Sequence, residues 1–263
     1  MSQDIDVKAA IAADPRLGRL RAWNIGAGIF HLVQLILVLM LANDFSIPIL
    51  ASYMEGPPGT APSAPVTLLD VPLAVGVALF FGLSALFHFV VSIPPFYARY
   101  IGGLAQGRNY FRWVEYSISS SIMIVLIVQI CGVSDAAALI AIFGVNASMI
   151  LFGWLQEKYE KPGEGKMLPF IFGCMTGVVP WLIIVLYVVS PNSGVDVSPP
   201  GFVYGIIVSL FLFFNCFAIV QWLQYKKNPI SYLSGEKAYI ILSLVAKSAL
   251  AWQIFSGTLI PTN

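Results

Sequence analysis

The sequence predicts an all-α membrane protein with seven transmembrane helices, and two observations carry this prediction. Hydrophobic residues make up 58% of the 263-residue chain and charged residues only 10%, whereas a soluble domain carries about 25% charged residues. Seven apolar segments are also long enough to cross a bilayer, which takes about 20 helical residues. Because these segments are apolar on most sides, we expect a single seven-helix domain over residues 1–263.

The seven predicted spans follow one another along the chain, mostly with short connections. They are expected at Leu20–Ala42, Val71–Tyr97, Phe111–Cys131, Ser134–Gln156, Leu168–Ser190, Gly201–Tyr225 and Ala238–Ile260. The long connection runs from Asn43 to Asp70 and contains the turn-forming run Gly56-Pro57-Pro58-Gly59. Its last stretch, Ala64 to Thr67, is a candidate strand.

The basic residues are distributed very unevenly between the connections. Thirteen of the fourteen lie in the N-terminal tail and the second, fourth and sixth connections: Lys8, Arg16, Arg19, Arg21, Arg99, Arg108, Arg112, Lys158, Lys161, Lys166, Lys226, Lys227 and Lys237. The first, third and fifth connections and the C-terminal tail contain none. Because basic loops stay in the cytoplasm, we expect the protein in the cell membrane with its N-terminus on the cytoplasmic side and its C-terminus on the outer side.

The fourteenth basic residue, Lys247, lies in the middle of the last predicted span, with no other charge between Ala238 and Ile260. A lysine at bilayer depth is costly, rare and usually functional. Burial disfavours the charged form of an amine, and a neutral amine is a nucleophile that forms a Schiff base with an aldehyde. Lys247 is therefore a candidate site of covalent attachment.

Three further ionisable residues lie inside the predicted spans. Glu115 is the acid that falls clearly within a span, and His31 and His88 are the two histidines of the chain. At a rise of about 1.5 Å per residue, these side chains and Lys247 all fall in a middle layer of the membrane. One amine, one acid and two imidazoles from four helices form a candidate internal site.

Structural roles for these residues also remain open. Glu115 lies close enough to the inner end of its helix to pair with Arg112 at the interface. Each histidine can be a hydrogen-bonded packing residue. Ser243 lies one helical turn before Lys247, and serines in membrane helices often bond to their own backbone.

Other kinds of site find little support. Two histidines and a glutamate can ligate zinc, but seven-helix membrane hydrolases with an internal zinc use three histidines, and this chain has two. No HExxH, GxSxG, GxGxxG or phosphate-loop pattern occurs. We therefore expect neither an enzyme nor a metal centre, and nucleic-acid binding has no support.

A retinal pigment explains more of these residues. A protonated Schiff base on Lys247 is a buried cation that needs a buried anion close by, and Glu115 is the candidate counterion. Retinal also needs an apolar, aromatic slot with a few polar groups. Candidate slot residues on the last three spans are Trp181, Tyr187, Phe211, Phe213, Phe214 and Trp252.

The competing hypothesis is an ion transporter or channel in which Lys247 and Glu115 form a gating ion pair. This hypothesis explains the two charges without any cofactor, and a light-driven or light-gated form would use the same residues. It leaves the aromatic slot unexplained.

Two segments then carry a family resemblance: Arg112-Trp113-Val114-Glu115-Tyr116-Ser117 in the third span and Leu242-Ser243-Leu244-Val245-Ala246-Lys247-Ser248 in the seventh. The same pattern includes His31, His88, Phe170-Ile171-Phe172-Gly173-Cys174 and Trp222-Leu223-Gln224-Tyr225-Lys226. These segments resemble the heliorhodopsins, whose membrane orientation is opposite to that of ordinary rhodopsins. The resemblance extends over all seven spans and agrees with a cytoplasmic N-terminus.

The resemblance implies roles for individual residues. Lys247 would carry all-trans retinal, with Glu115 as its counterion. The Schiff base would lie near a hydrogen-bonded network of His31, His88 and Ser243. Tyr116, Ser120, Asn146 and Phe214 look like pocket residues by their positions.

The resemblance also implies a homodimeric light sensor or regulator with a slow photocycle. A pump needs proton carriers on both sides of the Schiff base, and Glu115 is the one acid expected within the spans. We therefore expect no net ion pumping. Light would act on the cytoplasmic half, where the basic loops are available to an anionic protein partner.

Overall fold

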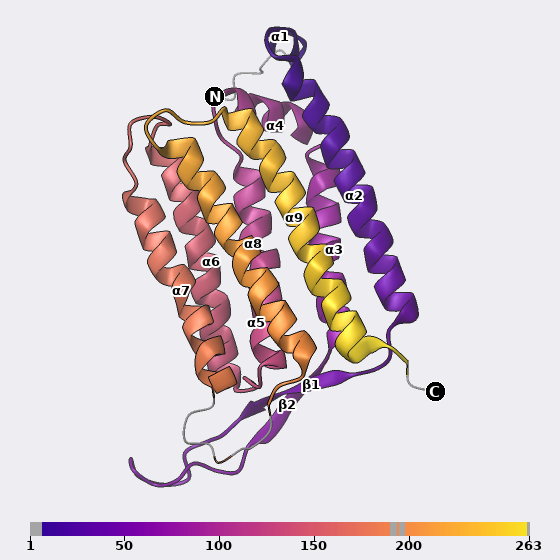
Figure 1. The fold of residues 1–263 in the computed structure, drawn as a ribbon, viewed down its shortest axis with the longest axis vertical. Coiled ribbons are helices and arrows are strands. Elements are labelled where there is room, and N and C mark those ends of the chain that lie inside the picture. The colour runs from indigo at the N-terminus through magenta and orange to yellow at the C-terminus, as the bar shows by residue number, and fades with distance from the viewer. Residues whose placement is uncertain (1–6, 190–193, 195–197, 262–263) are drawn as a thin grey trace.

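The computed structural model describes residues 7–189, 194 and 198–261, and it is a bundle of long helices above a small sheet (Figure 1). Seven helices in the described residues are long and apolar enough to cross a membrane. They are α2 (Pro15–Leu41), α3 (Leu73–Val90), α5 (Tyr110–Ile130), α6 (Ala136–Tyr159), α7 (Leu168–Val189), α8 (Gly201–Tyr225) and α9 (Tyr232–Ile254). A π-helical turn, η1 (Phe255–Leu259), continues α9. The predicted fold class is confirmed.

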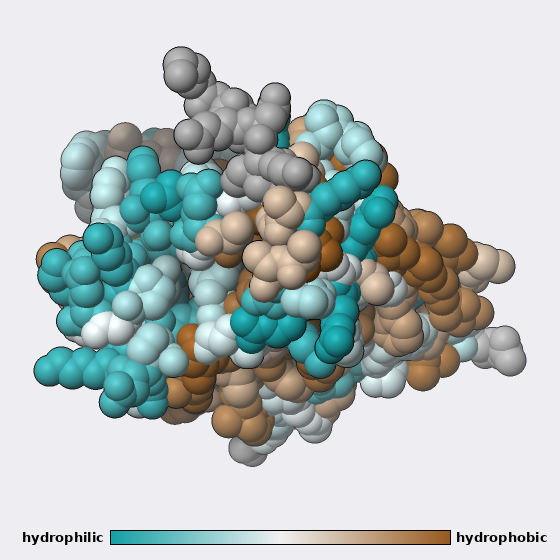
Figure 2. All heavy atoms as spheres, turned by 90° about the horizontal axis from the view of Figure 1, so that it is seen from above, coloured by the Kyte–Doolittle hydropathy of each residue, from teal (hydrophilic) through white to brown (hydrophobic). Residues whose placement is uncertain are grey.

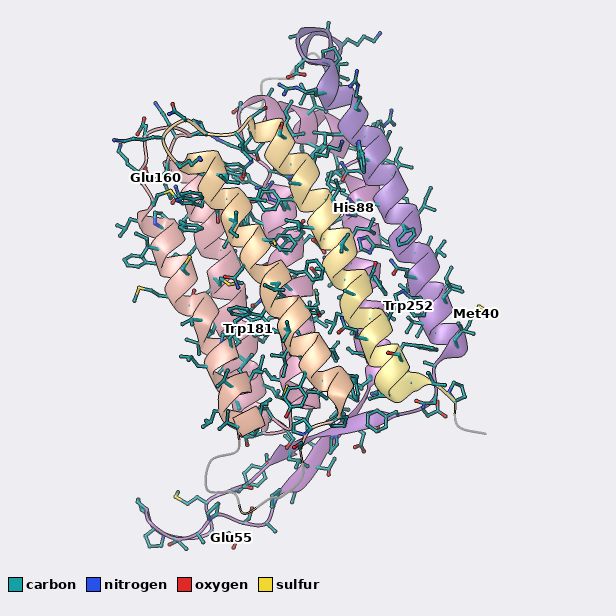
Figure 3. All side chains as sticks on the ribbon, in the orientation of Figure 1. Met40, Glu55, His88, Glu160, Trp181 and Trp252 are labelled. Carbon is teal, nitrogen blue, oxygen red and sulfur yellow. The ribbon has the colours of Figure 1, made fainter. Side chains whose placement is uncertain are left out.

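The long helices pack side by side. Helix α2 contacts α3 and α9, while α3 contacts α5, α5 contacts α6, α6 contacts α7, and α8 contacts α9. Fully buried side chains such as Phe80, Ile127 and Leu250 form the main core between them. Large apolar side chains also cover the outside of the bundle, and Met40 points away from it in Figure 3. An apolar outer surface of this kind suits contact with lipid.

The two ends of the bundle are built differently. One end carries the short helices α1 (Val7–Ala13) and α4 (Phe96–Ala105), and we call it the basic end. The other, the sheet end, carries the antiparallel strands β1 (Ser46–Ala51) and β2 (Val66–Pro72). The long connection was expected to contain short strands; the candidate at Ala64 to Thr67 overlaps the start of β2, whereas the position of β1 was not specified. The backbone N–H of Leu50 donates to Ser134 O over 2.8 Å, which holds the sheet against the α5–α6 turn.

Charge separates the two ends as clearly as secondary structure does. Viewed from above, the basic end shows hydrophilic residues gathered over its face, with hydrophobic residues mostly toward the edge (Figure 2). The described part of the sheet end contains the acids Asp44, Glu55, Asp70 and Asp135 and no lysine or arginine. Glu55 lies far out on the loop between the strands (Figure 3).

Several helix boundaries differ from the prediction, including the start of α2 at Pro15, and three of them affect the end of the bundle near α4. Helix α3 ends at Val90, because Pro94 and Pro95 disfavour helix in the residues before them, and the chain starts a separate helix at Phe96. Helix α6 continues to Tyr159, and α9 begins at Tyr232, six residues before the expected start. These extensions bring Glu157 and Glu236 into the helical bundle.

Candidate functional site

Lys247 forms a buried ion pair with Glu115 in the middle of the bundle. Its Nζ donates to Glu115 Oε1 over 3.0 Å and to Ser243 Oγ over 2.9 Å. The lysine and glutamate side chains are only 3% and 6% exposed. Ser84 on α3 donates to the same carboxylate oxygen over 2.7 Å. The two charges and two hydroxyls therefore form one polar centre joining α3, α5 and α9.

The two histidines lie side by side next to this centre. The ring of His31, which is fully buried, stacks on that of His88 with the centroids 5.6 Å apart and the planes 12° from parallel. Figure 3 shows His88 inside the bundle. Its Nδ1 lies 2.7 Å from Asn24 Oδ1, whereas both nitrogens of His31 are buried without a protein partner.

Close packing of α2 on α3 brings the imidazoles together. A Cβ added at Gly28 would lie 3.2 Å from His88 Cβ and 3.0 Å from Phe89 Cε1, so a larger residue would force the helices apart. Asn24 was not predicted as part of this site. It lies seven residues before His31, two helical turns along the same face, and that spacing could have indicated it.

A cavity begins at Lys247 and leads away from the ion pair. It lies between α5, α6, α8 and α9, and its apolar lining includes Tyr116, Met123, Met149, Ile150, Phe214 and Phe217. A second cavity shares Tyr116, Met149, Ile150, Phe214 and Phe217 and reaches Phe170, Gly173 and Cys174 on α7. Because the two cavities share five lining residues, they adjoin one another; we call them together the slot, which extends from Lys247 on α9 to Cys174 on α7.

The structure places the predicted pocket residues in or behind this slot. Tyr116, Ser120 and Phe214 line it. Asn146 lies behind Ser120 and donates to its Oγ over 2.9 Å. Trp181 on α7 packs edge-to-face on Phe214, with ring centroids 5.6 Å apart, and thus supports the slot from behind (Figure 3).

Four of the candidate aromatic residues lie elsewhere, and one of them, Phe213, packs partly buried against the main core. Tyr187 and Phe211 are 42% and 45% exposed, and Trp252 donates its Nε1–H to Gln34 on α2, away from the slot (Figure 3). Met149, Ile150 and Phe217 line the slot but were not predicted. Because these helices are apolar on nearly all sides, their hydrophobic pattern does not show which face is buried.

A second buried polar cluster corrects two expectations. Arg112 does not pair with Glu115; it forms ion pairs with Glu157 and Glu236, and its Nη2 lies 2.5 Å from Glu157 Oε2. Glu157 and Glu236 are 4% and 1% exposed. Glu115 was expected to be the one acid within the spans, but Glu157 and Glu236 are buried in the bundle as well. Their positions near the ends of α6 and α9 made both acids look like parts of connections.

The described residues include no group of three or more His, Cys, Asp or Glu side chains placed to hold a metal ion. The polar centre instead couples one lysine to one carboxylate beside an apolar slot. Such an arrangement suits a covalently held, elongated apolar ligand.

Two solved structures that superpose on the bundle are a rhodopsin and the transmembrane domain of a rhodopsin phosphodiesterase, so the bundle has the seven-helix rhodopsin fold. The transmembrane domain of Salpingoeca rosetta rhodopsin phosphodiesterase superposes with a TM-score of 0.69 at 14% identity, covering 95% of this chain and 86% of that one. Thermophilic rhodopsin from Rubrobacter xylanophilus gives a TM-score of 0.55 at 16% identity, covering 90% and 94%. At these identities the likeness shows the fold alone.

The sequence specifies the family more narrowly. The family model described as Heliorhodopsin matches residues 20–259, and the chain belongs to the heliorhodopsin family. No curated protein matches the chain. The protein is therefore a light-absorbing retinal protein that crosses the membrane several times.

Proposed function

We propose that Lys247 holds all-trans retinal as a Schiff base, that Glu115 is its counterion, and that the protein is a light sensor or regulator. The observation that carries this proposal is the buried contact of 3.0 Å between Lys247 Nζ and Glu115 at the head of the slot. When bound, retinal supplies the absorption of visible light and a change of shape on illumination.

The residues present fit such a group. The amine of Lys247 would become the nitrogen of the Schiff base. The slot that begins at this amine is apolar and partly aromatic. Tyr116 and Phe214 would hold the polyene, with Trp181 packed behind Phe214. Ser120 and Asn146 supply the few polar atoms that ligand pockets use for orientation.

The surrounding side chains would control charge at the Lys247 nitrogen. A carboxylate 3.0 Å away favours the positive form of that nitrogen. Ser84 and Ser243 hold the two charged groups in place by hydrogen bonds. His88 lines the same cavity as Glu115, so its imidazole is placed to take up a proton that leaves this centre.

We expect illumination to drive no net ion transport. A pump needs proton carriers on both sides of the nitrogen, but between Glu115 and the sheet end the described helices contain no Asp or Glu. The buried acids Glu157 and Glu236 lie on the other side, toward the basic end. A released proton would therefore return from the side it left.

Illuminated liposomes that contain the pigment test this expectation through pH and current recordings. Flat traces are expected, with a known light-driven proton pump as the positive control. A sustained signal that a protonophore abolishes would show instead that the protein is a transporter, the competing function for Lys247 and Glu115.

We further expect the basic end to face the cytoplasm, because thirteen of the fourteen basic residues lie there. A protease-cleavable tag at the N-terminus should be protected in intact cells, and a tag at the C-terminus should be cleaved. Cleavage of the N-terminal tag in intact cells, with a cytoplasmic marker left uncut, would contradict this orientation.

Two partners belong to the same proposal. Leu68 and Leu69 on β2 are 53% and 59% exposed. This apolar surface supports a homodimer whose contact includes the connection between α2 and α3. The hydrophilic face of the basic end, with its lysines and arginines, suits an anionic protein partner in the cytoplasm. We propose that the receptor itself is not an enzyme.

A further inference from the structure

A charged cluster is buried at the basic end, separate from the Lys247–Glu115 pair. Arg112 on α5 contacts Glu157 on α6 and Glu236 on α9. Asn109, the N-cap of α5, joins both acids: its backbone N–H donates to Glu157 and its Nδ2 donates to Glu236 Oε2 over 2.8 Å. All four residues are at most 8% exposed, so the cluster is buried.

The charges of the cluster do not balance. Two ionised carboxylates and one guanidinium leave a net charge of −1 in a buried site. The N-terminal ends of α5 and α9 offset part of this charge, but a helix end contributes less than a full ion. Burying an unpaired carboxylate is strongly unfavourable. A bound proton removes that cost.

Among the described residues, Arg112 is the one basic side chain that forms an ion pair with Glu157 or Glu236. The ammonium of Lys237, next to Glu236 in sequence, lies 4.5 Å over the Trp23 ring, and Lys158 lies over the Tyr159 ring. The remaining ionisable groups that interact with the cluster are tyrosines, which are neutral near pH 7. They are Tyr100 on α4, Tyr110 and Tyr116 on α5, Tyr225 on α8, and Tyr232 and Tyr239 on α9.

A polar cavity connects this cluster with the Lys247 site. Its lining includes Asn109, Arg112 and Glu236 together with Ser84, His88 and Glu115. Arg112 Nε and the hydroxyl of Tyr239 are buried and have no hydrogen-bond partner. Both residues line this cavity, and Tyr239 is 2% exposed. Buried polar atoms of this kind normally hydrogen-bond to a small polar species such as water.

We propose that Glu157 and Glu236 form a proton-binding site in which one of the two carboxyl groups is protonated in the dark, with Arg112 and Asn109 as fixed donors. The cavity links this site to Glu115, so a change of charge there alters how firmly the pair holds its proton. The site rests on the cluster itself and not on the attachment of retinal to Lys247.

Infrared spectroscopy of the purified pigment at neutral pH tests the site directly. We expect a carbonyl band from one protonated carboxyl group, which moves when the protein is labelled with ¹³C-glutamate. Either Glu157→Gln or Glu236→Gln should remove the band, because the remaining carboxylate is then balanced by Arg112. The matched control Glu160→Gln, three residues along from Glu157 and partly exposed, should keep it.

Two results would overturn the proposal. One is the absence of a protonated glutamate in the labelled wild-type protein, a measurement that needs no variant to fold. The other is a band that survives both cluster substitutions but disappears in Glu115→Gln, which would place the proton at the Lys247 site.

The coupling has its own readout in the pH at which the band disappears. In Glu115→Gln the loss of a negative charge near the cavity should move this midpoint to lower pH, because the cluster then holds its proton less firmly. An unchanged midpoint would show that the two sites are independent.

Discussion

Replacing Lys247 with alanine is expected to abolish visible absorption. Retinal can form a Schiff base only with an amine, and Lys247 is the one lysine buried beside the slot among the described residues. Wild-type protein regenerated with all-trans retinal should be coloured and should bleach with hydroxylamine. The variant, treated in the same way, should show no band beyond that of free retinal.

Controls separate loss of the attachment from loss of the fold. Lys247→Ala leaves Glu115 buried without its partner, and breaking a buried pair costs about 3–5 kcal/mol. Lys247→Arg keeps a cation beside Glu115 and should be equally colourless. Lys237→Ala, ten residues earlier on α9 with its ammonium over Trp23, should keep the wild-type colour. A Lys247→Ala protein with the wild-type spectrum would refute the assignment.

Much of the site could be anticipated from the cost of burying ionisable groups. Lys247, Glu115, His31 and His88 stand out because each is polar in an apolar segment, and helical rise places them at similar depth. The structure brings the four together from α2, α3, α5 and α9. Their depth could be estimated, whereas their pairing depends on which helix faces which.

The cluster of Arg112, Glu157 and Glu236 shows where such reasoning stops. Charges near the end of a hydrophobic segment are normally solvated, so the predicted spans ended before Glu157 and began after Glu236. The acids are instead buried because three helix ends meet around one guanidinium. Only the tertiary contacts distinguish this arrangement from three solvated loop residues.

Part of the slot lining, such as Met149 and Phe217, could not be predicted, for a different reason. In a bundle surrounded by lipid, apolar side chains face both the interior and the membrane, so hydrophobicity no longer marks the buried face. Trp181 and Phe214 lie inside, whereas Tyr187 is 42% exposed. The polar neighbours of the slot, Ser120 and Asn146, are better markers because a polar side chain in a membrane helix needs a partner.

Neutralising the counterion should change the colour strongly. The negative charge of Glu115 stabilises a positive nitrogen on Lys247 more in the ground state than after excitation, when positive charge moves along the polyene. In Glu115→Gln the absorption band should therefore shift to the red. If the nitrogen loses its proton at the working pH, the band should move to the ultraviolet instead.

A pH titration of the spectrum distinguishes these two forms of the variant. An opposite charge within about 4–6 Å favours the charged form of a group, and Glu115 Oε1 lies 3.0 Å from Lys247 Nζ. The Lys247 nitrogen should therefore deprotonate at lower pH in Glu115→Gln than in the wild type. In the control Glu164→Gln, which replaces an exposed acid paired with Lys166, this nitrogen should deprotonate at the same pH as in the wild type. Ser84→Ala gives an intermediate case, because it removes one hydrogen bond to the same carboxylate oxygen but keeps the charge. If Glu115→Gln matched the wild type in both spectrum and titration, another group would have to be the counterion.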